Sequence, residues 1–343
     1  MKRHHNTLYV TTQGAYLSAD GETVLVRVDD ETRGRFPLHM LESIVCFGRV
    51  SCSPALMGLC AERGIGISFL TERGRFLARV QGPVSGNVLL RREQYRRADD
   101  PAASAKLAKA FVIAKVLNAR TVILRAARDH PTMPGLTELK AAEEELASTL
   151  RLLEKEESLE VIRGLEGDAA RTYFGVFDHL IVAQKEDFVF RGRTRRPPLD
   201  NVNALLSFVY TLVTHDAASA LEAVGLDPQV GFLHRDRPGR PGLALDLVEE
   251  FRPFLADRLV LSLINRRQIH AKGFVTRETG GVVMDDETRK VVLVAYQERK
   301  QEEITHPFLK ETTTVGMLFH LQALLLARHL RGDLDGYPPF IWR

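Results

Sequence analysis

The pattern of hydrophobic and polar positions changes near residue 100. Residues 6–82 carry β-branched and aromatic residues in short pieces such as TLYVTT, TVLVRV and ISFL, and turn dipeptides such as Asp-Gly and Arg-Gly separate them. Short strands at close spacing predict a small β-rich domain. One helix is expected inside it, because Ser53 and Pro54 precede ALMGLCAERG as an N-cap and a first-turn proline, with a glycine stop.

After Pro101 alanine, leucine, lysine, arginine and glutamate recur at helical period, as in KLAKAFVIAKVLNARTVILRAA. This periodicity predicts a mostly α-helical region. Further helices are expected at residues 201–215, 243–251 and 314–331, with two β-prone segments, near Phe274 and at 290–296, as the exception.

These patterns predict an α+β protein, in which a small N-terminal β-rich domain precedes a larger, mostly α-helical domain. The expected boundaries are residues 1–85 for the β-rich domain and 102–343 for the helical domain. Residues 86–101 contain a basic stretch after Gly82-Pro83 and are expected to be a linker.

Composition narrows the class of protein. With 343 residues and 45% hydrophobic content, the chain can bury two cores. It has no run of roughly 18 apolar residues and starts with the polar MKRHHNT, so we expect a cytoplasmic protein. The cysteines, Cys46, Cys52 and Cys60, lack CxxC spacing and lie in apolar surroundings, which predicts core thiols.

Positive charge is clustered, although the net charge is only +3. Such clusters favour a surface that follows DNA phosphates, because neutralising phosphates releases counterions. A solvated face remains the alternative for any single cluster. The arginines cluster in three places: Arg91, Arg92, Arg96 and Arg97; Arg191, Arg193, Arg195 and Arg196; and Arg235, Arg237 and Arg240.

One run, from Gly225 to Pro253, holds candidate metal ligands. His234 lies in a glycine-bounded segment, and Asp246 and Glu249 are spaced i, i+3 in an apolar helical pattern. Carboxylates and an imidazole suit Mn²⁺ or Mg²⁺. Both acids can face one ion, or one can ligate while the other orients it. The alternatives are a helix-terminus preference for the acids and a hydrogen-bonded loop histidine.

Three runs together carry a family resemblance: EGDAARTYF, RTRRPPLDNVNALLSFVY and GLDPQVGFLHRDRPGRPGLALDLVEEFRP. They resemble the CRISPR-associated spacer-acquisition endonuclease and integrase, the universal first core protein of CRISPR adaptation. The resemblance spans nearly the whole chain, and the closing YPPFIWR is similar to the type I-C branch.

The resemblance assigns roles to residues of this chain. Glu166, His234 and Glu249 match the family's three metal ligands, and Asp246 matches the accompanying catalytic acid. Many members have aspartate where Glu249 stands, which leaves the division of labour between Glu249 and Asp246 open. Glu249 is chosen over Glu250 because its i, i+3 spacing from Asp246 fits the family pattern.

The resemblance also implies an activity and partners. The 3′-hydroxyl of a short foreign DNA fragment would attack a phosphodiester at the repeat of a CRISPR array, with Mn²⁺ or Mg²⁺ as cofactor. The β-rich domain would form a homodimer, and a small second core CRISPR-associated protein would bridge two dimers. The mostly α-helical domain would be the catalytic domain. The residues expected to hold double-stranded DNA by its phosphates are Arg91, Arg92, Arg96, Arg97, Arg191, Arg193, Arg195, Arg196 and Arg237.

Two other functions compete with integration. The chain could be a stand-alone metal-dependent nuclease acting on branched or single-stranded DNA, since the same site would serve. It could also be a non-catalytic DNA-binding scaffold, in which Asp246 and Glu249 are structural.

Overall fold

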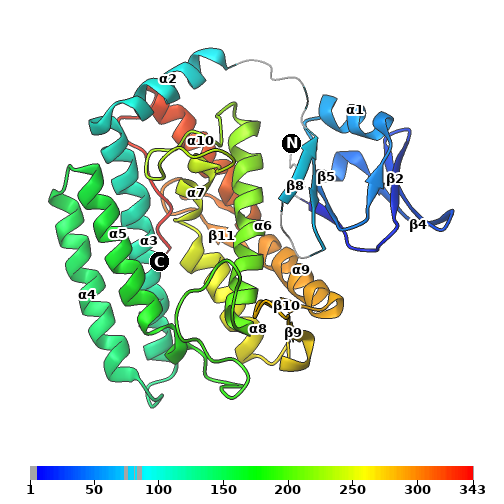
Figure 1. Ribbon diagram of the computed structural model, residues 1–343. Helices are drawn as coiled ribbons and strands as arrows, with labels where there is room; N and C mark the ends of the chain where they lie inside the picture. Colours follow the sequence, from blue (N-terminus) through cyan, green and yellow to red (C-terminus); the bar gives the residue numbers. More distant parts are fainter. Residues whose placement is uncertain (1–5, 73–75, 81, 83–86, 343) are drawn as a thin grey trace. The chain divides into compact units, whose positions relative to one another are not determined.

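The computed structural model describes residues 6–72, 76–80, 82 and 87–342. The chain forms two compact units, which are described separately. The β unit consists of residues 1–86 and 285–300. The helical unit consists of residues 87–284 and 301–343. The expected α+β class, with a β-rich region followed by a helical region, is confirmed (Figure 1).

The β unit contains two four-stranded sheets, in the orders β1-β5-β7-β8 and β4-β3-β2-β6. In the first sheet β5 pairs in parallel with both β1 and β7. The second is built on the antiparallel pairs β2-β3 and β3-β4. The strands are β1 (Asn6–Val10), β2 (Tyr16–Asp20), β3 (Thr23–Val28), β4 (Glu31–Pro37), β5 (Leu41–Phe47), β6 (Ser51–Cys52), β7 (Gly66–Leu70) and β8 (Phe76–Val80).

The core of the β unit is apolar and includes all three cysteines. Leu17, Val24, Ile44 and Ile67 from the strands pack with Leu56 from helix α1. Helix α1 (Pro54–Glu62) begins as predicted, because Ser53 Oγ accepts a hydrogen bond from the backbone N–H of Leu56 at 3.2 Å. The prediction of core thiols is confirmed, since the cysteines are buried and burial raises the pKa of each; the three are Cys46, Cys52 and Cys60.

Two of the expected turn dipeptides can be checked in the β unit. Gly21 lies at a turn with φ +54°. Gly34 lies inside β4 and pairs with Val26, so the turn expected at Arg33-Gly34 was wrong. The pairing register of β3 and β4 shifts between Val26 and Arg27, which is the pattern of a β-bulge or a similar irregularity. The dipeptide Arg73-Gly74 falls outside the described residues.

The expectation of a β-prone segment at residues 290–296 was wrong. This segment lies in helix α9 (Asp286–Gln301). Its valine run suggested a strand, but Val292, Leu293 and Tyr296 are buried at helical spacing, and burial decides the outcome. Gln297 Nε2 donates to the backbone O of Thr7 at 3.1 Å, which fastens α9 to the first strand of the β unit.

The helical unit holds most of the remaining elements (Figure 1). Its helices of four turns or more include α3, α4, α5 and α6, and short strands pair as β9-β10 and β11-β12. Its elements are α2 (Val88–Asp99), α3 (Pro101–Asp129), α4 (Leu136–Lys155), α5 (Leu159–Gly175), η2 (Phe177–Leu180), α6 (Asn201–Ala223), α7 (Gly242–Val248), η3 (Arg252–Asp257), α8 (Arg258–Asn265), η4 (Ala271–Gly273), β9 (Phe274–Thr276), β10 (Val282–Met284), β11 (Glu303–Thr305), β12 (Thr312–Thr314), η5 (Val315–Met317) and α10 (Leu318–Arg331).

The segment 86–101, expected to be a linker, contains helix α2. Gln94 is buried, and its Nε2 donates to the backbone O of Asp227 at 2.7 Å and of Val230 at 2.8 Å. These bonds fasten α2 to the segment that follows α6. The helical unit therefore begins one helix earlier than the sequence analysis expected.

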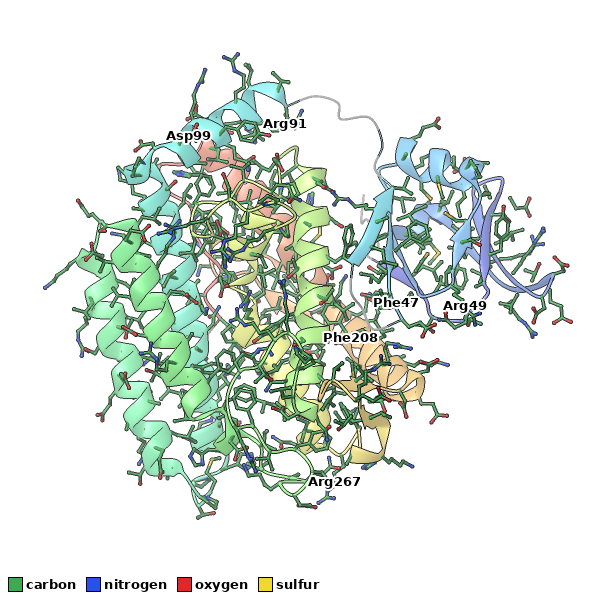
Figure 2. The ribbon with its side chains drawn as sticks, in the orientation of Figure 1. Phe47, Arg49, Arg91, Asp99, Phe208 and Arg267 are labelled. Carbon is green, nitrogen blue, oxygen red and sulfur yellow. The ribbon has the colours of Figure 1, made fainter. Side chains whose placement is uncertain are left out.

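Helices α3, α4 and α5 pack against one another, and α6 packs against α7 and α10 (Figure 1). Side chains fill the spaces between these helices (Figure 2). Among the described residues, α6 is the one helix long and apolar enough to cross a membrane, and 61% of its apolar stretch is buried in the protein. Its 13 buried residues make it a core helix of the unit.

Candidate active site

Asp246 fixes the segment that carries His234. Its carboxylate, on α7 and fully buried, accepts backbone N–H bonds from Phe232 at 2.6 Å, Leu233 at 3.0 Å and His234 at 3.0 Å. The approach requires glycine, because a Cβ on Gly231 would lie 2.7 Å from Asp246 Oδ2. The glycine-bounded segment is therefore held tightly against the helix.

The same carboxylate sets the state of the imidazole. Oδ1 of Asp246 lies 2.7 Å from Nδ1 of His234. A carboxylate with three backbone donors can only accept, so Nδ1 donates to Asp246 and Nε2 faces away from it. Nε2 lies 3.9 Å from Oε1 of Glu249. Of the two roles that the sequence left open for Asp246, the contacts match that of orienting His234.

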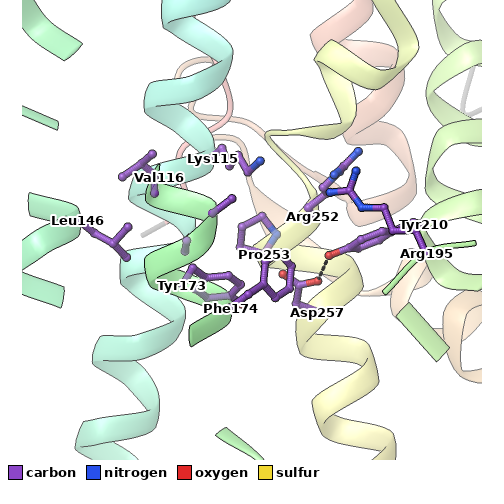
Figure 3. Close-up of a pocket in the computed structure, with 13 residues that line it drawn as sticks. Lys115, Val116, Leu146, Tyr173, Phe174, Arg195, Tyr210, Arg252, Pro253 and Asp257 are labelled. Carbon is purple, nitrogen blue, oxygen red and sulfur yellow. Dashed lines mark hydrogen bonds between the residues drawn. The ribbon is translucent and has the colours of Figure 1, made fainter. Parts of the chain in front are cut away.

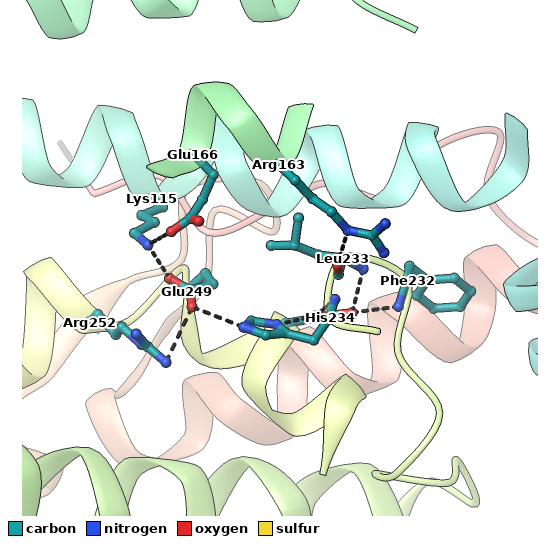
Figure 4. A network of polar contacts seen from close by, with 9 residues as sticks. Lys115, Arg163, Glu166, Phe232, Leu233, His234, Glu249 and Arg252 are labelled. Carbon is teal, nitrogen blue, oxygen red and sulfur yellow. Dashed lines mark hydrogen bonds and ion pairs between the residues drawn. The ribbon is translucent and has the colours of Figure 1, made fainter. Parts of the chain in front are cut away.

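Glu249 lies at the end of α7 among cations (Figure 4). Its Oε2 is 2.7 Å from Lys115 Nζ, and its Oε1 is 3.2 Å from Arg252 Nη2. Burial raises the pKa of this carboxyl, but the charges of Arg252, Lys115 and His234 outweigh burial and lower the pKa to about 2. Glu249 is therefore an anion held inside the protein.

Glu166 reaches the same place from α5 and makes an ion pair with Lys115. Glu166 lies in the middle of α5. Lys115 comes from α3 and is buried between the two glutamates (Figure 4). Burial lowers the pKa of Lys115, but Glu249 and Glu166 raise it by more, so the ammonium keeps its charge.

Sequence reasoning missed Lys115 and Arg252. Both carried a signal, because a lysine within the apolar run FVIAKVLNA and an arginine at i+3 from Glu249 are placed to meet a buried anion. It placed Glu166, His234, Asp246 and Glu249 in one site, and the structure brings these four side chains together across α5, the segment before α7, and α7.

The donor set can be tested for a divalent ion. Among the described residues, no group of three or more His, Cys, Asp or Glu side chains is already arranged to hold a metal. The chemistry nevertheless fits. Two donors each about 2.1 Å from one ion lie between about 3 and 4.2 Å apart, and the 3.9 Å from His234 Nε2 to Glu249 Oε1 falls in this range. The Lys115 ammonium lies between Glu166 and Glu249 and contacts both. A divalent ion held by these two glutamates would therefore have to displace the ammonium.

A small pocket adjoins these residues (Figure 3). Arg252 begins η3, a short π-helix, and Asp257 ends it. The hydroxyl of Tyr210 donates to Asp257 Oδ1 at 2.6 Å, and burial raises the pKa of Asp257 to about 6. The pocket is lined by Lys115, Val116, Ala119, Leu146, Ala169, Ala170, Tyr173, Phe174, Arg195, Tyr210, Arg252, Pro253 and Asp257.

The predicted DNA-contacting arginines fall into two groups. Arg193 is an internal residue: it donates to Asn203 Oδ1 at 2.7 Å and to Ser207 Oγ at 3.1 Å. Arg97 is also engaged, with Glu93 Oε1 at 2.9 Å and with the backbone O of Leu330 at 3.3 Å. The exposed members are Arg92, Arg96, Arg191, Arg195, Arg196 and Arg237, and Arg91 is half-buried.

Some exposed arginines gather beside the site. Burial lowers the pKa of Arg240, and the nearby charges of Arg237, Arg195 and Arg252 lower it further, while Asp246 raises it. Arg195 and Arg237, from two separate loops, therefore lie near the residues that hold Glu249 and His234.

The chain is similar to known proteins of one family. The model of a family described as CRISPR associated protein Cas1 matches residues 8–298. A protein of Chlorobaculum tepidum named CRISPR-associated endonuclease Cas1 1 is 60% identical over 343 residues, which is the full length of both chains.

Solved structures share the fold. A casposase bound to an integration product has a TM-score of 0.84 at 22% identity, covering 98% of this chain and 94% of that one. A chain of a Cas6-RT-Cas1–Cas2 complex has a TM-score of 0.82 at 22% identity, covering 100% of this chain and 36% of that one.

Proposed function

Since this chain belongs to the Cas1 family of CRISPR-associated proteins, we propose that it is a metal-dependent DNA endonuclease and integrase of CRISPR adaptation. It joins the 3′-hydroxyl of a short foreign DNA fragment to a phosphodiester of the CRISPR array by transesterification. The observation that carries the proposal is the meeting of Glu166, His234 and Glu249 from separate elements beside a cluster of arginines.

Glu166, His234 and Glu249 would hold the divalent ion, Mn²⁺ or Mg²⁺. A bound ion of this kind polarises the phosphoryl oxygen and stabilises charge on the attacking and leaving oxygens. The single imidazole favours Mn²⁺ over Mg²⁺. Asp246 and Arg252 support the set, because Asp246 directs Nε2 of His234 toward Glu249 and Arg252 holds Oε1 of Glu249.

The exposed arginines near the site would hold DNA phosphates. Arg195 and Arg237 lie near Arg240 and Arg252, and Arg191 and Arg196 belong to the same loop as Arg195. Phosphate contacts position the duplex without reading its sequence. Arg193 and Arg97 bond to other residues of the protein, so we assign them a structural role and not a DNA contact.

Two protein partners belong to the proposal. One neighbour in fold is a chain of a Cas1–Cas2 complex, which supports a small second core CRISPR-associated protein as partner. We further propose a homodimer formed through the β unit, in the cytoplasm, and a type I-C system on the basis of the closing YPPFIWR. Light scattering of the full chain, alone and with the second core protein, measures both assemblies.

The test is an integration assay. The protein is incubated with Mn²⁺, a DNA fragment ending in a 3′-hydroxyl and a supercoiled plasmid bearing a CRISPR array. Joined products that disappear when the fragment carries a 3′-deoxy end support the proposal. Nicking of branched or single-stranded DNA without joining would make it a stand-alone nuclease, and DNA binding unaffected by chelation, with no products, would make it a scaffold.

A further inference from the structure

Lys115 occupies an unusual position at the centre of the site. Its ammonium lies 2.7 Å from Oε2 of Glu249 and also makes an ion pair with Oε1 of Glu166. The three residues come from α3, the end of α7 and α5. The Lys115 ammonium thus links α3, α5 and the end of α7 (Figure 4). Only 11% of the Lys115 side chain is exposed, so these ion pairs are largely shielded from water.

The Lys115 ammonium offsets the repulsion between the carboxylates of Glu166 and Glu249. Two carboxylates brought together inside a protein repel each other, and the repulsion is weakly screened there. Glu249 has a second cation in Arg252, at 3.2 Å. Among the described residues Glu166 has ion-pair contact with Lys115 alone. The Lys115 ammonium contacts both carboxylates, whereas Arg252 contacts that of Glu249 and acts on Glu166 only from a greater distance.

The same position conflicts with a divalent ion. An ion bound by Glu166 and Glu249 would lie between their oxygens, where the Lys115 ammonium now contacts both. Two cations cannot share this space, because their repulsion in a buried site is as strong as the attraction that holds each one. Lysine can move away, since its stem has four flexible carbons.

The pocket next to the site offers Lys115 a place to move to. Lys115 is one of its lining residues, and the carboxyl of Asp257 lies in the same wall (Figure 3). An ammonium that left the glutamates would therefore still find an oxygen acceptor inside the pocket.

We propose that Lys115 is an internal counter-cation of the active site. It holds Glu166 and Glu249 together in the metal-free protein and gives up this place when a divalent ion binds. Lys115 is thus a positioning residue that keeps the ligands assembled and lowers the affinity of the site for metal. The inference rests on the proposed metal site.

The experiment measures metal binding without DNA. Mn²⁺ is titrated into the full-length protein and followed by electron paramagnetic resonance, for wild type, Lys115→Met and Lys115→Gln. Methionine and glutamine nearly keep the length of the side chain but lack its charge. We expect both variants to bind Mn²⁺ about tenfold more tightly or better, because no ammonium has to be displaced. Lys106→Met, an exposed lysine on the same helix, is the matched control and should bind as wild type does.

A second readout is thermal stability. Metal-free Lys115→Met should melt at a lower temperature than wild type, because the two carboxylates lose the cation between them. Saturating Mn²⁺ should raise its melting temperature by more than it raises that of wild type. If Lys115→Met does not fold, the same melting temperatures are measured for Lys115→Gln.

Three outcomes are distinguishable. Tighter Mn²⁺ binding by folded Lys115 variants supports the inference. Equal or weaker binding by them, while wild type binds and His234→Ala does not, overturns the inference and leaves the proposed function intact. Absence of Mn²⁺ binding in wild type and all variants overturns the metal site, and the inference falls with it.

Discussion

The carboxyl groups of Glu249 and Glu250, adjacent in the chain, contact separate sets of partners. Glu249 meets Lys115 and Arg252 in the active site. Glu250 accepts hydrogen bonds from the hydroxyl of Tyr337 at 2.5 Å and the backbone N–H of Phe340 at 2.6 Å. One carboxyl group therefore belongs to the candidate active site, and its neighbour anchors the C-terminal segment.

We expect each of Glu166→Ala, His234→Ala and Glu249→Ala to abolish Mn²⁺-dependent joining, because each removes one donor of the site. Affinity for DNA should change by less than about threefold, since none of the three contributes positive charge. Joining is measured on the array plasmid and affinity by fluorescence anisotropy. Asp168→Ala is the matched control, an exposed carboxylate on the same helix as Glu166. Activity near that of wild type in any of the three would remove that residue from the site.

Asp246→Asn should reduce Mn²⁺ affinity by about 10- to 100-fold. Asparagine keeps the shape but presents a donor where two oxygens accept from Phe232, Leu233 and His234. Electron paramagnetic resonance gives the affinity, and joining at saturating Mn²⁺ should recover in part, because the ligands themselves remain. An unchanged Mn²⁺ affinity would contradict the assignment of Asp246 as the residue that orients His234.

Binding to DNA should weaken steeply as salt rises. Replacing Arg195, Arg196 and Arg237 by glutamine should lower the slope of log Kd against log salt by about 0.9 for each phosphate that the variant no longer neutralises. The melting temperature should stay close to that of wild type, since these side chains are exposed. Arg193→Gln, in contrast, should destabilise the fold, because Arg193 bonds Asn203 and Ser207 internally. A salt slope that no exposed substitution changes would exclude this surface.

The stability of the protein should fall as pH rises from about 5 to about 8. Burial raises the pKa of Glu250 to about 8 from 4.5, so the folded protein keeps a proton that the unfolded chain has lost. The free energy of unfolding then decreases with pH across this window, by roughly 3 to 4 kcal/mol. Glu250→Gln should flatten the dependence, as measured by urea unfolding at several pH values. Parallel pH profiles for wild type and variant would refute the assignment.

The C-terminal segment should contribute strongly to stability. Phe340 is fully buried and stacks on Phe251 with ring centroids 5.5 Å apart, and its backbone N–H bonds Glu250. Phe340→Ala should cost about 3 to 5 kcal/mol of unfolding free energy in urea titrations. Phe308→Ala is the control, because half of Phe308 is exposed. A loss below about 1 kcal/mol would mean that the segment is only loosely held.

Local patterns predicted many elements of the fold well. The strands of the β unit, the capped helix after Ser53 and the long helix after Asp200 follow from β-branched alternation, N-cap chemistry and helical period. The errors at residues 290–296 and 86–101 have one cause. In both places the local composition was ambiguous, and contacts with distant residues, Thr7 in one case and Asp227 in the other, decided the structure.

The sequence by itself determined the chemical inventory of the site: the glutamates, the histidine and the aspartate at i−3 from Glu249, in an order that identifies the family. Only the tertiary structure decided their roles. Asp246 contacts the imidazole of His234, Glu250 bonds the C-terminal segment while Glu249 does not, and Lys115 lies between Glu166 and Glu249. The physical reason is that hydrogen bonds and ion pairs depend on distances of a few ångströms between residues remote in the chain, which spacing along the sequence does not specify.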